Sequence, residues 1–147
     1  MNRKRLTATL VLMMFAIFAL SLAGERWHWD ILFWWFDVLL HLSGGFWVSL
    51  FFIWFFCADG LPIFKLRSGQ TGPLLATRTF LFVLVIGVLW DVFQFLTKSR
   101  IGAEPWSAPD TISDLFINTA GCLVALFYYR KIIMLPTENN VHPVAEL

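Results

Sequence analysis

Charged side chains are scarce in this chain of 147 residues. Asp, Glu, Lys and Arg make up 14% of it, whereas a soluble domain usually contains about 25%. Apolar residues account for 59% of the chain, including 16 Phe and 8 Trp. A soluble core of this size could not hide so much apolar surface, so we expect lipid to be the solvent for most of the chain.

Cysteine and the familiar catalytic motifs are also scarce or missing. The two cysteines, Cys57 and Cys122, lie in or beside apolar runs without the CxxC spacing of a zinc or redox site. No P-loop, strand-linked GxGxxG, GxSxG elbow or HExxH helix occurs in the sequence. The well-known sequence signatures of nucleotide-binding proteins, serine hydrolases and metalloproteases are therefore excluded.

What the chain does contain is four long apolar stretches, each comparable with the span of about 20 residues that crosses a bilayer. They cover about 6–23, 31–57, 74–96 and 111–129. The pattern predicts an all-α, polytopic transmembrane helical bundle with four spans. We expect one transmembrane domain over residues 1–135, followed by a disordered cytoplasmic tail over 136–147.

The first stretch has two interpretations. Its basic start, apolar run and Ser21-Leu22-Ala23 sequence imitate a secretory signal with a cleavage site. The run is about 17 residues long, however, whereas the apolar part of such signals is usually about 7–15. We expect this stretch to be retained as a transmembrane helix.

Lys and Arg predict the orientation. Eight of them fall at the two ends and in the middle loop, and three fall on the other side of the predicted bundle. The eight are Arg3, Lys4, Arg5, Lys65, Arg67, Arg78, Arg130 and Lys131, and the three are Arg26, Lys98 and Arg100. The positive-inside rule therefore predicts that both termini are cytoplasmic.

Polar side chains inside the last three spans lie at helical spacing. Asp37 and His41 are four residues apart, Asp91 and Gln94 three, and Asp110, Asp114 and Asn118 four. Residues at these intervals share one face of a helix. At 1.5 Å per residue, Asp37 lies about 9 Å and His41 about 15 Å into the second span, and the other polar residues lie at similar depth from the outer side. The sequence therefore predicts a polar pocket in the extracytoplasmic leaflet.

Structural roles compete with this interpretation. Asp110 is well placed as a helix N-cap, Asp114 as a first-turn acid that favours the helix dipole, and Asn118 as a hydrogen-bonding partner of a neighbouring helix. The pairs Asp37–His41 and Asp91–Gln94 could hold helices together. Gly44, Gly45 and Gly121 are most simply positions of close helix packing.

Three chemistries suit the predicted pocket. Carboxylates with one His can hold a divalent cation that activates water. An Asp–His pair can also serve acid–base chemistry or a proton relay. Alternatively, Arg100 with Lys98 could bind a lipid phosphate while acids and amides bind the rest of the head group.

The combination FDVLLH, WDVFQF, a following Arg and DLFINTAG resembles the VanZ-like membrane proteins, with YjdF-like membrane proteins as a close second. The resemblance covers about residues 36–125. It places the family's recurrent polar residues on Asp37, His41, Asp91, Gln94, Arg100, Asp114, Asn118 and Gly121. The chain departs from VanZ-like proteins in two ways. They usually have Glu at the position of Asp91, which reaches one methylene further. They also have a shorter link between the Arg and the fourth span, which weakens the role of Arg100. The resemblance implies a bacterial inner-membrane protein of the cell envelope, in a family associated with glycopeptide antibiotic resistance.

The leading prediction is recognition or processing of a cell-envelope lipid or lipid-linked wall precursor. Asp37, His41, Asp91 and Asp114 would be the acid–base or cation-holding groups; Gln94, Asn118 and Asp110 would contact the substrate, and Arg100 its phosphate. Whether catalysis or binding alone occurs, and whether a divalent cation takes part, stays open at the sequence level. The alternatives are a cation- or proton-coupled transporter and a structural or assembly subunit. We expect membrane lipids as partners and no nucleic acid, with a homo-oligomer left open.

Overall fold

The computed structural model describes residues 2–57, 72–100 and 107–134, apart from the side chains of residues 30, 31, 57 and 97–100. The helices are α1 (Arg3–Trp27), α2 (Trp29–Leu32), α3 (Trp34–Cys57), α4 (Pro73–Arg100) and α5 (Ala108–Tyr128), and a π-helical turn at Tyr129–Ile133 extends the last. No strand occurs in these ranges. The expected tail over 136–147 lies outside the described residues.

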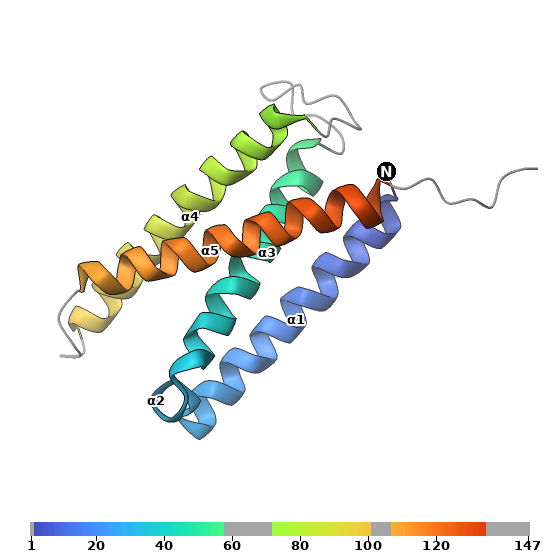
Figure 1. The fold of residues 1–147 in the computed structure, drawn as a ribbon. Coiled ribbons are helices and arrows are strands. Elements are labelled where there is room, and N and C mark those ends of the chain that lie inside the picture. The colour runs from blue at the N-terminus through green and yellow to red at the C-terminus, as the bar shows by residue number, and fades with distance from the viewer. Residues whose placement is uncertain (1, 58–71, 101–106, 135–147) are drawn as a thin grey trace, which may run out of the picture.

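Among the described residues, four helices are long and apolar enough to cross a membrane, namely α1, α3, α4 and α5 with its π-helical extension. Large apolar side chains such as Leu12 (70% exposed) and Phe116 (74% exposed) point away from the bundle, as lipid-facing residues do. The prediction of an all-α bundle with four spans is confirmed. In Figure 1, α1 and α4 lie on either side of α3, and α5 crosses α3.

The second span begins later than the sequence predicts. His28, with φ of 54° in the left-handed region, ends α1, and the short α2 ends at Phe33, whose backbone is extended. The transmembrane helix α3 therefore begins at Trp34 and not near Ile31. Asp37 lies three residues, or about 4.5 Å, inside α3 and not about 9 Å, which brings it closer to the membrane surface.

The start of α5 also differs from one expectation. Ser107 is the N-cap, and its hydroxyl oxygen accepts a hydrogen bond from the backbone N–H of Asp110 at 3.5 Å. Asp110 lies in the first turn and is exposed, so the interpretation of Asp110 as the N-cap is wrong. Ser107 with an acid three residues later resembles the capping-box pattern, which could have shown this from the sequence.

The apolar core fills one end of the bundle, where α1 and α4 begin and α3 and α5 end. Its buried members are Leu6, Leu10, Leu50, Phe52, Ile53, Leu75, Ala125, Tyr129 and Ile133. The polar residues of the predicted pocket lie toward the opposite end of the same helices. The bundle is thus divided along its length into an apolar half and a half that contains the polar groups.

The first helix is an integral part of this core. Leu6 and Leu10 are buried in it. The indole N–H of Trp47 donates to the carbonyl oxygen of Leu10 at 2.9 Å, and the hydroxyls of Thr9 and Tyr128 are also 2.9 Å apart. These contacts make α1 part of the bundle core, and its retention in the mature protein stays a prediction.

The two ends of the described chain meet. The backbone N–H of Asn2 donates to the carbonyl oxygen of Ile133 at 3.0 Å, so both ends lie at the apolar end of the bundle, as four spans require. That this end faces the cytoplasm is predicted by the positive charges alone.

Candidate functional site

Two glycines bring α3 and α5 into backbone contact. A Cβ atom on Gly45 would overlap the backbone carbonyl of Asn118, and a Cβ on Gly121 would overlap the carbonyl oxygen of Leu42. Only glycine allows two helices to approach this closely. The close approach carries Asp114 and Asn118 of α5 to the side of α3 on which His41 lies. The expected packing role is therefore confirmed for these two glycines.

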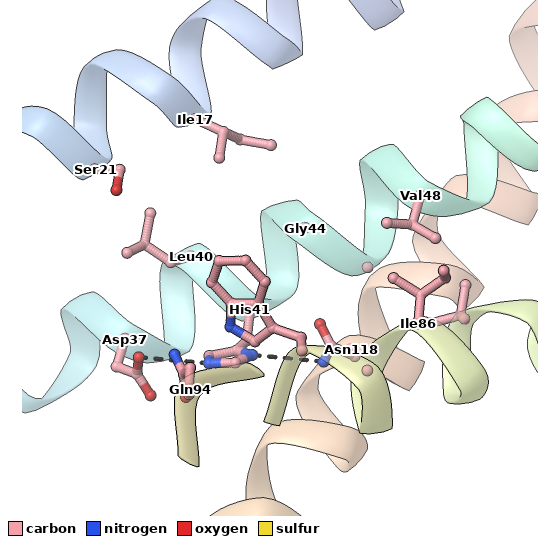
Figure 2. A pocket seen from close by; sticks show the side chains of 14 residues that line it. Ile17, Ser21, Asp37, Leu40, His41, Gly44, Val48, Ile86, Gln94 and Asn118 are labelled. Carbon is pink, nitrogen blue, oxygen red and sulfur yellow. Dashed lines mark hydrogen bonds and ion pairs between the residues drawn. The ribbon is translucent and has the colours of Figure 1, made fainter. Parts of the chain in front are cut away.

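Around His41 the structure brings together four of the predicted site residues. Its Nε2 atom lies 3.5 Å from Oδ1 of Asp37 and 3.4 Å from Oδ2 of Asp114. Its Nδ1 atom lies 3.5 Å from the side-chain nitrogen of Asn118. Figure 2 shows the contacts with Asp37 and Asn118 as dashed lines. His41 is thus the centre of a polar cluster formed with Asp37, Asp114 and Asn118.

Burial differs across this polar cluster. The side chains of His41 and Asp114 are both 7% exposed, whereas that of Asp37 is 54% exposed. Asp114 therefore lies behind the imidazole, and Asp37 lies between the imidazole and the surface. If Asn118 donates to Nδ1, then Nε2 carries a hydrogen that points between two carboxylates. Such an arrangement can stabilise a proton on Nε2. In the other tautomer, with the hydrogen on Nδ1, Nε2 is free to bind a metal ion.

Asp91 of α4 lies beside this cluster. It is 8% exposed and close enough to interact electrostatically with His41 and Asp114. The Thr111 side chain, at the start of α5, is within hydrogen-bonding reach of the Asp91 carboxylate. The second oxygen, Oδ2, is buried and has no hydrogen-bond partner among the described residues. A buried carboxylate oxygen without a partner is costly to maintain.

A cavity of about 280 Å³ adjoins the polar cluster. Its walls come from α1, α3 and α4, with Asn118 contributed by α5. Figure 2 shows Asp37 and Gln94 at one end, with Val48 and Ile86 toward the other, and Ile17 and Ser21 of α1 on the opposite side. The cavity is therefore polar at the outer end and apolar toward the middle of the bundle.

Gly44 lines this cavity. A Cβ added there would meet no heavy atom within 4 Å. The expectation that Gly44 is a close-packing position is therefore wrong, because this residue faces open space while its neighbour Gly45 faces α5.

A family of predicted membrane proteins, DUF2238, has a model that matches residues 1–133. The chain belongs to this family. No curated protein and no solved structure matches it. The match supports a membrane protein that crosses the bilayer several times, and it does not extend to the VanZ-like family in particular. All four spans and all eight predicted site residues of this DUF2238 protein lie inside the matched range.

The remaining predicted residues are placed differently. Gln94 lines the cavity, as expected for a residue that contacts a ligand. Asp110 is exposed in the first turn of α5 and does not line the cavity. Arg100 is the last residue of α4, and its side chain, like that of Lys98, lies outside the described part of the chain. Phosphate binding by Arg100 therefore stays a prediction.

Sequence reasoning missed the contribution of the first helix to this site. Ile17 and Ser21 line the cavity, but α1 contains no acid or amide at this depth to mark its inner face. In the sequence, Ser21, four residues after Ile17, stands out only as part of a cleavage-site pattern. The four-residue spacing puts Ile17 and Ser21 on one face of α1. Only the arrangement of the helices shows that this face lines a cavity.

The unpartnered oxygen of Asp91 leads to a prediction about stability. Asp91→Asn should raise the free energy of unfolding by about 1–3 kcal/mol, because it removes a buried charge whose second oxygen lacks a partner. Denaturation of the protein in mixed micelles by increasing SDS measures this. Asp110→Asn, at an exposed acid, should change the same quantity by no more than about 0.5 kcal/mol. A clear loss of stability in Asp91→Asn would mean that the charged oxygen is needed to hold α4 in place.

Proposed function

We propose that this DUF2238 protein binds an amphiphile of the cell envelope, a lipid or a lipid-linked wall precursor, from the outer leaflet of the bacterial inner membrane. The observation that carries this proposal is the cavity, with a polar end at His41 and an apolar end toward Val48. A head group would meet the polar end while the attached chain lies along the apolar end.

The size of the cavity limits how much of the ligand it holds. About 280 Å³ is slightly below the range of about 300–1,000 Å³ typical of pockets for drug-sized molecules. A whole lipid is larger than this. The cavity therefore accommodates the part of an amphiphile where head group and chain join, and the rest of the chain stays in the bilayer.

The polar end offers distinct contacts to a head group. Gln94 and Asn118 supply amides that donate and accept hydrogen bonds, and Asp37 supplies a half-exposed carboxylate. His41, with Nε2 between two carboxylates, is the described group best placed to accept or donate a proton. Asp37, His41, Asp91 and Asp114 thus remain our candidates for acid–base chemistry, with binding as the basic activity.

The resemblance to VanZ-like proteins supports an envelope role. Residues from three of the short motifs on which it rests contribute to the polar cluster and the cavity: Asp37 with His41, Gln94, and Asp114 with Asn118. The proposal extends from there to a role in susceptibility to glycopeptides.

The described core argues against a coupled transporter. At the inner end, the buried hydroxyls of Ser49 and Thr79 each donate to a carbonyl of their own helix, that of Gly45 and Leu75 respectively. The surrounding side chains are the apolar core. A route for ions to the cytoplasmic side would need polar groups that this part of the described chain does not offer.

Filling the cavity tests the proposal. Gly44→Leu adds four side-chain carbons to a space where a Cβ meets nothing. It should weaken amphiphile binding at least about tenfold, which corresponds to about 1.4 kcal/mol of lost contacts. Native mass spectrometry of protein released from nanodiscs measures this, with phosphatidylglycerol, phosphatidylethanolamine and a polyprenyl phosphate as probes.

The matched control is Val124→Phe. It enlarges a side chain on α5 that is 53% exposed and away from the cavity. Its lipid adducts should equal those of the wild type. Equal adducts in Gly44→Leu as well would show that the lipids bind elsewhere, and the proposed function would then be wrong.

A further inference from the structure

Three potential metal ligands converge at the outer end of the site. One ligand atom from each of Asp37, His41 and Asp114 lies within 4.8 Å of the other two. Asp37 and His41 share one face of α3, at i and i+4, and Asp114 comes from α5 across the glycine contact. Two rigid helices thus position the set, and no loop contributes a ligand.

The separations match a transition-metal site. Zn²⁺ binds imidazole nitrogen at about 2.0–2.1 Å and carboxylate oxygen at about 2.0–2.2 Å, so two ligand atoms at a tetrahedral angle lie about 3.3–3.5 Å apart. Nε2 of His41 lies 3.5 Å from Oδ1 of Asp37 and 3.4 Å from Oδ2 of Asp114. The third separation, between the ligand oxygens of Asp37 and Asp114, is at most 4.8 Å.

The same separations are longer than typical charge-assisted hydrogen bonds. Charge-assisted N–H···O hydrogen bonds are about 2.7–2.9 Å long, whereas the two contacts of Nε2 are 3.5 and 3.4 Å long. The spacing leaves room for an ion between the three atoms.

The surroundings suit a metal-bound histidine. With Nε2 on an ion, Nδ1 carries the hydrogen and needs an acceptor. Asn118 lies at Nδ1, 3.5 Å away, and rotating its amide by 180° presents the oxygen in place of the nitrogen. Asp91, buried beside the cluster with Oδ2 unpartnered, supplies a further negative charge. The unpartnered oxygen of Asp91 is independent support for a cation here, and Asn118 is compatible with one once its amide is rotated.

We propose that Asp37, His41 and Asp114 form a site for one divalent transition-metal ion of the Zn²⁺ type. Imidazole with two carboxylates is a ligand set that such ions accept. Three protein ligands leave a fourth position for water or an outside ligand, as in catalytic and not structural zinc sites. The carboxylates alone would repel a lipid phosphate, and a bound divalent cation removes this repulsion. This last role rests on the proposed function.

Titration with Zn²⁺ and Co²⁺ tests the site directly. The full-length protein in lipid-free detergent is treated with chelator and titrated with Zn²⁺ by calorimetry, and Co²⁺ is added separately to record its visible absorption. We expect one ion per chain and the intense absorption bands of four-coordinate Co²⁺. His41→Gln and Asp37→Asn should each weaken Zn²⁺ binding at least about 100-fold. Glu25→Gln, at an exposed acid of α1, should bind as the wild type does.

The outcomes are distinct from those of the lipid experiment. Zn²⁺ binding that is absent, or unchanged in both His41→Gln and Asp37→Asn, overturns the metal site. Asp37 is half exposed, so its variant folds even if the His41 variant does not. Gly44→Leu leaves the three ligands in place and should still bind one Zn²⁺, so loss of lipid binding there leaves the metal site standing.

Discussion

Gly45→Ala will lower the stability of the bundle, while Gly44→Ala, one residue away on the same helix, will raise it. A Cβ on Gly45 would overlap the backbone carbonyl of Asn118, which cannot move without shifting α5. Such overpacking costs about 1–3 kcal/mol, and more when backbone must move. The Cβ of Gly44→Ala meets nothing within 4 Å, and alanine gains up to about 1 kcal/mol in helix propensity.

The two variants should therefore differ by about 2–4 kcal/mol in the free energy of unfolding. SDS titration in mixed micelles measures the difference, and both proteins contain the same atoms, so composition is controlled. Gly45→Ala should also weaken ligand binding, because moving α5 displaces Asp114 and Asn118 from His41. Equal stability of the two proteins would mean that α3 and α5 do not make the backbone contact on which the site depends.

The four spans could be predicted from the apolar stretches, because the main requirement for a helix that crosses lipid is that it is long and apolar. The shared helix faces of the polar groups followed from the spacing of Asp37 and His41, and of Asp114 and Asn118, since helical periodicity puts each pair on one face. Whether these two faces meet depends on how α3 and α5 pack against each other. The sequence predicted convergence, and the glycines at positions 45 and 121 supply its cause.

Other features depend on information that a linear pattern does not carry. The break at Phe33 has no proline or glycine beside it, so the sequence predicts one uninterrupted span from about residue 31. Gly44 and Gly45 are chemically identical, and only the position of α5 shows that Gly45 packs against its backbone while Gly44 faces open space. Ser107 and Asp110 did carry a capping signal, which the apolar run beginning at Thr111 obscured.

The interpretation as a helix clasp and the interpretation as a ligand site make opposite predictions for Asp114→Asn. The amide keeps the shape of the side chain and removes its charge. Hydrogen bonds between helices in membranes contribute about 0.6 kcal/mol on average and at most about 1.7. The 3.4 Å contact with His41 belongs at the weak end, and α3 and α5 are held by glycine contacts and the apolar core. We therefore expect Asp114→Asn to accumulate and to unfold like the wild type.

Binding should respond very differently. Asp114→Asn removes one of the two carboxylate ligands and should weaken Zn²⁺ binding at least about 100-fold, a free-energy change of about 2.7 kcal/mol. The lipid adducts should decrease as well. Asp114→Glu, which restores a carboxylate, should recover part of both. A variant that fails to accumulate while Asp114→Glu accumulates normally would show that the charge holds the helices together. A folded Asp114→Asn that has lost both ligands would instead show that the buried carboxylate serves binding. Its cost in membrane insertion is then offset by function and not by stability.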